Sequence, residues 1–322
     1  MTPFEPLFRN PHAQTVAGHL WRRSRDDARF PVRRRLFRTE PDVQVLVESQ
    51  RPAGEAAGEI VMVHGLEGSG ESGYMRGLAG AALRAGFGAH RFNMRTCGGT
   101  ERLCRTLYHA GLTSDLLAVV RELQAESAAP LFLVGFSLGG NVVLKLAGEL
   151  GAAARDLFRV VCAVSTPLDL ETCARRIAEP RNRLYERRFV RLMRARLYAT
   201  GRYFPDQFAG LLSLMDIDDR ITAPSFGFHG ARHYYNTQSA IRFLDGIRVP
   251  VLLIQAKDDT FIPFEVFDAA AVRTNPWVEL LAPSHGGHLG FIGRAPRRFW
   301  ADGVIMEWIV EKSVQEPLVR SR

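Results

Sequence analysis

The sequence predicts an α/β fold with a mostly parallel, doubly wound sheet and an inserted helical cap. Short apolar runs alternate with helix-like segments along most of the chain, as they do where helices connect parallel strands that are buried on both faces. The alternation stops near Ser165 and resumes near Val249. The roughly eighty residues between these points are too many for a simple connection, so we expect them to form a cap.

The same patterns predict the individual elements. Segments 32–37 and 43–48 should pair as a hairpin at one sheet edge. Further strands are expected at 59–63, 86–94, 131–134, 158–164, 249–255 and 277–281, and helices at 72–83, from 113 onward, at 141–146 and at 296–311. The first 30 residues should be irregular, because Pro3, Pro6 and Pro11 discourage a long helix. The expected units are an arm with the first part of the core (1–165), the cap (166–246) and the remaining core (247–322).

The composition is that of an ordinary globular protein. Of the 322 residues, 46% are hydrophobic and 24% charged, which excludes a disordered chain. The net charge of +8 comes from arginine, but no basic run is interleaved with aromatic residues, so we expect no nucleic-acid partner. The four cysteines lack the spacing of a zinc site. We therefore expect free thiols in a reducing cytoplasm. The N-terminal sequence predicts no signal peptide, and we expect no membrane-spanning helix. No metal or organic cofactor is expected.

The stretch around Ser137 has the form of a nucleophile elbow. Gly135 and Gly139 flank this serine, between an apolar strand-like run and a helix-like segment. A serine on such a sharp strand-to-helix turn is held in strained backbone, and larger residues at the glycine positions would collide. The motif is short enough to occur by chance. It carries weight only if partners for the serine occur elsewhere.

Candidate partners for Ser137 follow later strands. A serine hydroxyl needs an imidazole to accept its proton and a carboxylate to orient that imidazole. The acid is Asp258 or Asp259, and the spacing from the end of the preceding strand favours Asp259. The base is His285 or His288, and the glycines on both sides of His288 favour it, because they let the loop approach the serine. The order serine, acid, histidine is that of α/β-hydrolases.

Acyl transfer also needs two hydrogen-bond donors for the oxyanion of the tetrahedral intermediate. The first candidate is the backbone N–H of Leu138, which follows the nucleophile. The second is the N–H of Leu66, in the strand-end segment His64-Gly65-Leu66-Glu67-Gly68. His64 is then expected to be structural.

Within the cap, segment 183–197 is amphipathic. One helical face carries Arg183, Arg187, Arg191 and Arg194. The other face is apolar, with Arg188 and Arg196 as exceptions. The helix either packs its apolar face on the core with its arginines in water, or presents a basic surface to an anionic membrane while covering the active site.

Together these motifs resemble the YheT-like, or AB-hydrolase-4, family of α/β-hydrolases, which is related to abhydrolase-domain 1 and 3 proteins. The resemblance rests on His12-Ala13-Gln14-Thr15, His64-Gly65-Leu66-Glu67-Gly68-Ser69, Asn93-Met94-Arg95, Tyr108-His109-Ala110-Gly111, Gly135-Phe136-Ser137-Leu138-Gly139-Gly140-Asn141, Asp258-Asp259 and Gly287-His288-Leu289-Gly290-Phe291. The family commonly has glycine where this chain has Thr96.

The resemblance implies a serine hydrolase with Ser137 as nucleophile, Asp259 as acid and His288 as base. Its expected substrates are carboxylic esters, either short- to medium-chain acyl esters or lipid-like esters. Two alternatives stay open: an acyltransferase on the same triad, and a binding protein without catalytic activity.

Overall fold

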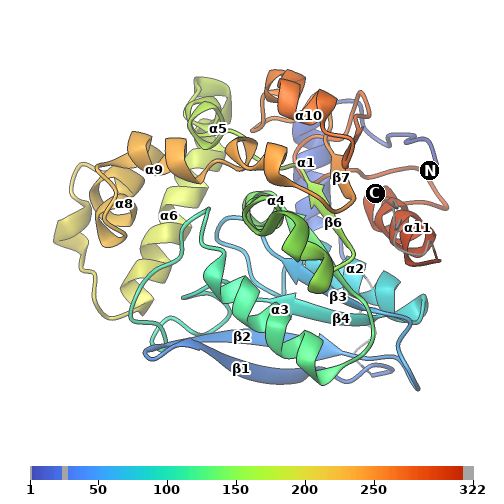
Figure 1. Ribbon diagram of the computed structural model, residues 1–322. Helices are drawn as coiled ribbons and strands as arrows, with labels where there is room; N and C mark the ends of the chain where they lie inside the picture. Colours follow the sequence, from blue (N-terminus) through green and yellow to red (C-terminus); the bar gives the residue numbers. More distant parts are fainter. Residues whose placement is uncertain (1, 24–27, 315–322) are drawn as a thin grey trace.

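A sheet of eight strands runs through the computed structural model, which describes residues 2–23 and 28–314 (Figure 1). Its strand order is β1-β2-β4-β3-β5-β6-β7-β8. The pairs β1–β2 and β2–β4 are antiparallel, and the others are parallel. The strands are β1 (Arg33–Glu40), β2 (Val43–Gln50), β3 (Glu59–Val63), β4 (Gly88–Phe92), β5 (Leu131–Phe136), β6 (Val160–Val164), β7 (Val251–Ile254) and β8 (Val278–Leu281). The predicted edge hairpin and the mostly parallel sheet are thus confirmed.

Helices cover both faces of the sheet, as a doubly wound fold requires. Every residue of β3 is buried, and successive side chains face opposite sides. Ile60 and Met62 pack in the core with side chains of α2 and α11, whereas Val61 and Val63 pack with those of α3 and α4. These helices are α2 (Gly73–Arg84), α3 (Ser114–Glu126), α4 (Leu138–Leu150) and α11 (Trp300–Val314).

The N-terminal arm differs from the expectation of an irregular segment. It contains helix α1 (Pro11–Leu20), which Asn10 caps by accepting a hydrogen bond from the Ala13 N–H at 3.0 Å. Pro11 occupies the first turn, where a helix needs no N–H donor and where the fixed φ of proline suits the helix. The proline therefore starts the helix instead of breaking it.

The segment between β6 and β7 is helical. Its α-helices are α5 (Leu170–Ile177), α6 (Arg183–Ala199), α7 (Leu214–Ile217), α8 (Ala223–Ser225) and α9 (Ala231–Gln238). Val190, Met193 and Leu197 of α6 are buried in an apolar cluster with Phe208 and Leu211. The helices α6, α8 and α9 lie together on one side of the molecule, away from α11 (Figure 1).

The exposure of the α6 arginines differs from the prediction that Arg183, Arg187, Arg191 and Arg194 share one face. Arg183, Arg187 and Arg191 are exposed, as expected for that face. Arg194 is partly buried and donates to the backbone carbonyls of Phe208 and Leu211. It does not simply face water, because the turn after α6 folds back over it.

The C-terminal helix also begins later than predicted, at Trp300 instead of residue 296. The preceding residues are held in a turn, in which the Gly293 N–H donates to the Arg298 carbonyl and Ile292 forms a β-bridge with Phe299. These backbone pairings of Gly293 and Ile292 hold the segment before Trp300 in a non-helical conformation. A further short helix, α10 (Ala270–Thr274), precedes β8.

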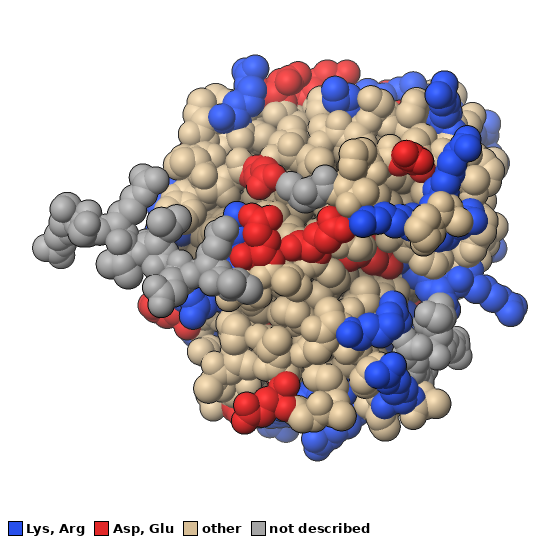
Figure 2. Space-filling model, turned by 90° about the vertical axis from the view of Figure 1, so that its right-hand side faces the viewer, with Lys and Arg blue, Asp and Glu red and all other residues tan. Residues whose placement is uncertain are grey.

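Charges of both signs share the face that carries α11. Figure 2 shows a band of acidic side chains across the middle of this face and basic side chains around it. The surplus of arginine therefore does not make this face a continuous basic surface.

Three further features concern residues 2–23 and 28–314. No helix in these ranges is long and apolar enough to cross a membrane. Cys97, Cys104, Cys162 and Cys173 are buried and free. In the same ranges, no group of three or more His, Cys, Asp or Glu side chains could hold a metal ion.

Candidate active site

Ser137 sits on the turn between β5 and α4 with φ +50° and ψ −120°. Its N–H donates to the Val164 carbonyl at 2.8 Å, and its carbonyl accepts from the Gly140 N–H at 2.8 Å. A Cβ atom at position 135 would collide with the carbonyl of Gly139, and one at position 139 with the carbonyl of Val63. The glycines are therefore required for the turn, which holds the serine in a backbone conformation that L-residues rarely adopt.

His288 lies between Ser137 and Asp259. Its Nε2 is 3.0 Å from Oγ of Ser137, and its Nδ1 is 3.2 and 3.1 Å from the two carboxylate oxygens of Asp259. The Asp259 side chain is 0% exposed and the His288 side chain 8%. The three residues follow β5, β7 and β8, whose carboxyl ends meet at one rim of the sheet.

The carboxylate of Asp259 is held by donors of its own loop. Its Oδ1 accepts from the N–H groups of Phe261 and Ile262 at 2.8 and 3.1 Å, and its Oδ2 accepts from Nε2 of Gln255 at 3.2 Å. The orientation of the carboxylate toward the imidazole is therefore fixed before any substrate binds.

The other two candidates, Asp258 and His285, pair with each other. Nδ1 of His285 is 3.2 Å from Oδ2 of Asp258. Oδ1 of Asp258 accepts from the Gly287 N–H at 2.9 Å. This second pair braces the loop that carries His288, and it does not contact Ser137.

The N-terminal arm supports the same loop. Oγ1 of Thr15 accepts from the His288 N–H at 2.9 Å. Gln14, which is buried, donates to the Ile292 carbonyl at 3.0 Å and accepts from its N–H at 2.8 Å. The sequence pattern gives no signal for the Thr15 contact, because it joins residues 273 positions apart.

Both candidate oxyanion donors belong to segments that adjoin the serine. Leu138 is the first residue of α4, and the first N–H groups of a helix have no acceptor within it. Leu66 follows Gly65, where a Cβ atom would lie 3.0 Å from the Cβ of Ser137. The loop that carries Leu66 therefore lies against the elbow.

His64 supports this loop as a neutral ring. Its Nε2 accepts from the Met94 N–H at 3.1 Å, so Nδ1 carries the proton and donates to the Gly65 carbonyl at 2.8 Å. Burial lowers the pKa of His64 to about 4. Both nitrogens are occupied by backbone groups, so this histidine is not available to transfer protons.

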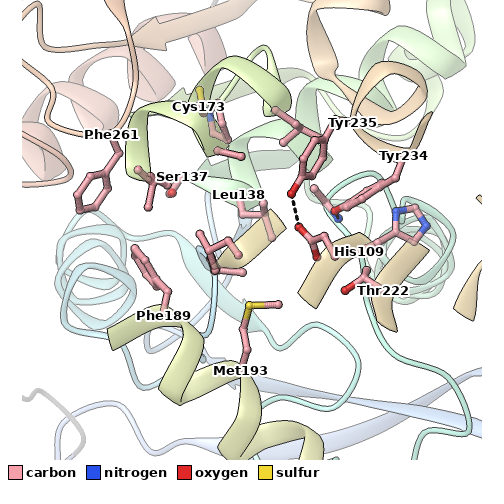
Figure 3. Close-up of a pocket in the computed structure, with 18 of the residues that line it drawn as sticks. His109, Ser137, Leu138, Cys173, Phe189, Met193, Thr222, Tyr234, Tyr235 and Phe261 are labelled. Atoms are coloured by element: carbon pink, nitrogen blue, oxygen red, sulfur yellow. Dashed lines mark hydrogen bonds between the residues drawn. The ribbon is translucent and has the colours of Figure 1, made fainter. Parts of the chain in front are cut away.

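A pocket opens from Ser137 beneath the helices between β6 and β7. Most of its lining is apolar. In Figure 3, Phe261 and Phe189 lie near the Ser137 side, whereas Tyr235, Tyr234 and Thr222 lie on the opposite side. The pocket thus joins an apolar region beside the serine to a more polar far end.

Asp218 belongs to the polar end. It begins a π-helical turn, η4 (Asp218–Thr222), and its Oδ2 accepts from the Tyr235 hydroxyl at 2.6 Å. Burial raises the pKa of Asp218 to about 6, against the opposing effect of hydrogen bonds from Tyr235 and Thr222 and of the positive charge of Arg196. Such π-helical turns are frequent at functional sites.

We expect Asp218→Asn to remove a pH dependence of stability. Because the pKa of Asp218 is higher in the folded chain than in the unfolded one, wild type loses stability as pH rises from about 4 to above 6. The variant should therefore be more stable than wild type at pH 7.5, by on the order of 3 kcal/mol, and equal to it near pH 4. Thermal unfolding at both pH values checks this. A gap that is the same at both would contradict it.

The sequence of this chain matches that of a known protein family. Residues 60–302 match the sequence profile described as the alpha/beta hydrolase family. The chain belongs to this family. The hydrolase is 35% identical to the YheT protein of Escherichia coli over 94% of this chain and 91% of that protein. The resemblance indicated by the motifs is thereby confirmed.

Two further comparisons extend this result. The hydrolase is 29% identical to a protein of Saccharomyces cerevisiae named monoacylglycerol lipase, over 76% of this chain, and it spans 57% of the length of that relative. The solved structure of the Pyrococcus furiosus esterase Pf2001 matches with a TM-score of 0.59 at 17% identity, covering 96% of this chain and 99% of that chain. The second comparison supports the fold alone.

Proposed function

We propose that this carboxylic ester hydrolase works through a covalent acyl-enzyme on Ser137. His288 serves as general base and Asp259 orients its ring, while the N–H groups of Leu66 and Leu138 stabilise the oxyanion. The observation that carries the proposal is the connected set of three side chains: Nε2 of His288 is 3.0 Å from Oγ of Ser137, and its Nδ1 is 3.1 Å from Oδ2 of Asp259. Of the three, Ser137 lies on the strained turn.

The reaction proceeds in two halves. Oγ of Ser137 attacks the ester carbonyl carbon while Nε2 of His288 takes its proton, and the negative charge of the intermediate lies on the former carbonyl oxygen. The intermediate collapses as His288 returns the proton to the leaving alcohol. Water then attacks the acyl-enzyme with His288 again as base, which releases the carboxylic acid and restores Ser137.

The pocket favours esters with an apolar portion. Ile177, Phe189, Met193 and Phe261 contribute apolar side chains to its lining, and such side chains bind alkyl groups by removing their surface from water. We therefore propose short- to medium-chain acyl esters or lipid-like esters as substrates. Residues 166–246 are proposed to act as the cap that shapes the pocket and excludes water.

A rate profile over p-nitrophenyl esters of increasing acyl length tests this function. The hydrolysis rate should rise from acetate to medium chains and then fall when the chain exceeds the pocket. Adding an alcohol acceptor and analysing the products separates hydrolysis from acyl transfer, since free acid as the sole product excludes the transferase. A flat profile would contradict the assignment of the pocket to the acyl chain.

The outer face of α6 is proposed to contact anionic membranes. Arg183, Arg187 and Arg191 line a groove that also includes Leu212, which is 76% exposed, and Leu184 beside them is 79% exposed. Exposed leucines next to arginines suit an interface in which apolar groups enter the lipid and charges meet headgroups.

Replacing Arg183, Arg187 and Arg191 together by glutamine should weaken binding to phosphatidylserine vesicles by on the order of 100-fold, at about 1 kcal/mol per arginine. Hydrolysis of a soluble p-nitrophenyl ester should stay unchanged. The matched control replaces the exposed Arg33, Arg38 and Arg159, which lie outside α6. Equal losses in both triple variants, measured by vesicle co-sedimentation, would sink the idea of a specific surface.

A further inference from the structure

One arginine of α6 turns inward, toward the loop that carries Leu66. Nε of Arg196 donates to both carboxylate oxygens of Glu67 at 2.9 and 3.0 Å. The two side chains are 9% and 3% exposed. Arg196 also lines the pocket, together with Ser137 and Leu66. A buried ion pair thus links the helical segment after β6 to the residue next to a proposed oxyanion donor.

Further contacts hold both partners of this ion pair. The Tyr108 hydroxyl donates to Oε1 of Glu67 at 3.0 Å and accepts from the Glu67 N–H at 3.2 Å. The guanidinium of Arg196 lies over the Tyr108 ring, 4.6 Å from its centroid. Neither partner can change its position without breaking several of these interactions.

Thr96 supplies another acceptor for the arginine. Its Oγ1 accepts from Nη1 of Arg196 at 2.8 Å. Thr96 has φ +58° and Glu67 has φ +53°, a left-handed conformation that is unfavourable for a β-branched residue and uncommon for any other side chain. The chain therefore keeps side chains at two strained positions, and both of them bind Arg196.

The charge of Glu67 matters for the reaction. An unpaired buried carboxylate on the residue that follows Leu66 would oppose the negative charge that develops on the oxyanion, whereas the neutral ester in the ground state would be affected far less. Arg196 cancels that charge. It also fixes the loop from which the Leu66 N–H must point at the oxyanion, and such donors act only when they are oriented in advance.

We propose that Arg196 is a positioning residue for ester hydrolysis: its ion pair with Glu67 orients the Leu66 loop and neutralises the carboxylate of the residue that follows this donor. This proposal rests on the function proposed above. It assigns to the helical segment a part in transition-state stabilisation as well as in covering the pocket.

The test is a double-mutant cycle with Arg196→Met, Glu67→Gln and the combined variant, measuring kcat and KM on a p-nitrophenyl ester. Arg196→Met should lower kcat by about 10- to 100-fold, below the roughly 10²–10³ of losing a donor outright, with KM changed less than about threefold. The combined variant should recover at least about fivefold of that kcat, because it no longer contains an unpaired carboxylate.

A purely structural role for Arg196 predicts the opposite pattern. The loss would then fall on KM, and the combined variant would be no better than Arg196→Met. Either result, or a kcat for Arg196→Met within about twofold of wild type, would overturn the proposal. Ser137→Ala is measured in parallel: if it hydrolyses the ester as fast as wild type, the proposed function fails, whereas a Ser137-dependent activity that is insensitive to Arg196 sinks only the present inference.

A milder pair of variants covers the case in which Arg196→Met does not fold. Thr96→Gly relieves the backbone strain but removes an acceptor of Arg196, whereas Thr96→Ser keeps that acceptor. We expect kcat of Thr96→Gly to fall about two- to fivefold below that of Thr96→Ser, although glycine suits this φ better. Equal or higher turnover in Thr96→Gly would contradict the proposal.

Discussion

Ser137→Ala should lower kcat/KM for p-nitrophenyl esters by a factor of about 10⁴ or more, since loss of the nucleophile removes the acyl-enzyme route entirely. The residual rate would come from the oxyanion donors and from binding alone. Alanine at position 137 would adopt the same φ of +50° as serine at a similar conformational cost. The variant should therefore fold with a Tm close to that of wild type.

A fluorophosphonate probe checks the same residue without relying on a chosen substrate. Wild type should be labelled and Ser137→Ala should not, while Ser127→Ala, a change at the end of α3, serves as the matched control and should label normally. If the Ser137→Ala chain is labelled and hydrolyses esters like wild type, another group is the nucleophile. If intact wild type is not labelled and behaves like Ser137→Ala, the proposed serine-hydrolase mechanism fails.

The core and the elbow could be predicted because each has a recognisable pattern within its own stretch of sequence. A run such as Leu131 to Val134 is apolar at every position, which is typical of a strand buried on both faces. Gly135 and Gly139 mark the turn, because carbonyl groups occupy the space that their side chains would need. The local sequence therefore indicated both the strand and the turn that follows it, although carbonyl groups of other strands, such as that of Val63, also require the glycines.

The contacts that hold the site together could not be predicted in the same way. Arg196 looks like an exception on the apolar face of a helix, and only the fold brings Glu67 to it across 129 positions of sequence. Thr15 likewise reaches the His288 backbone across 273 positions. Helical periodicity predicts which side of a helix faces the protein interior, but it does not predict which side chains that face contacts.

The second large effect on turnover is expected at one of the two adjacent aspartates. Asp259→Asn should lower kcat by about 10²- to 10⁴-fold, because an amide replaces one of the two acceptor oxygens that face the imidazole by an NH₂ group and removes the negative charge that stabilises the charged form of the ring. Asp258→Asn should cost less than about tenfold, since Asp258 contacts His285 and the Gly287 N–H but not His288. The two substitutions are chemically identical and adjacent, so each controls for the other.

Measuring kcat and KM for both variants, with Tm recorded, separates catalysis from stability. In Asp259→Asn the amide oxygen can still accept hydrogen bonds from the Phe261 and Ile262 N–H groups, as the carboxylate does, so the loop should keep its shape while turnover falls. The reverse ranking, with Asp258→Asn the more damaging to kcat, would mean that the pair Asp258 and His285 moves to serve Ser137 in the active enzyme. That outcome would require the loop after β8 to rearrange, because Thr15 and Ser165 now fix it through the backbone N–H groups of His288 and Leu289.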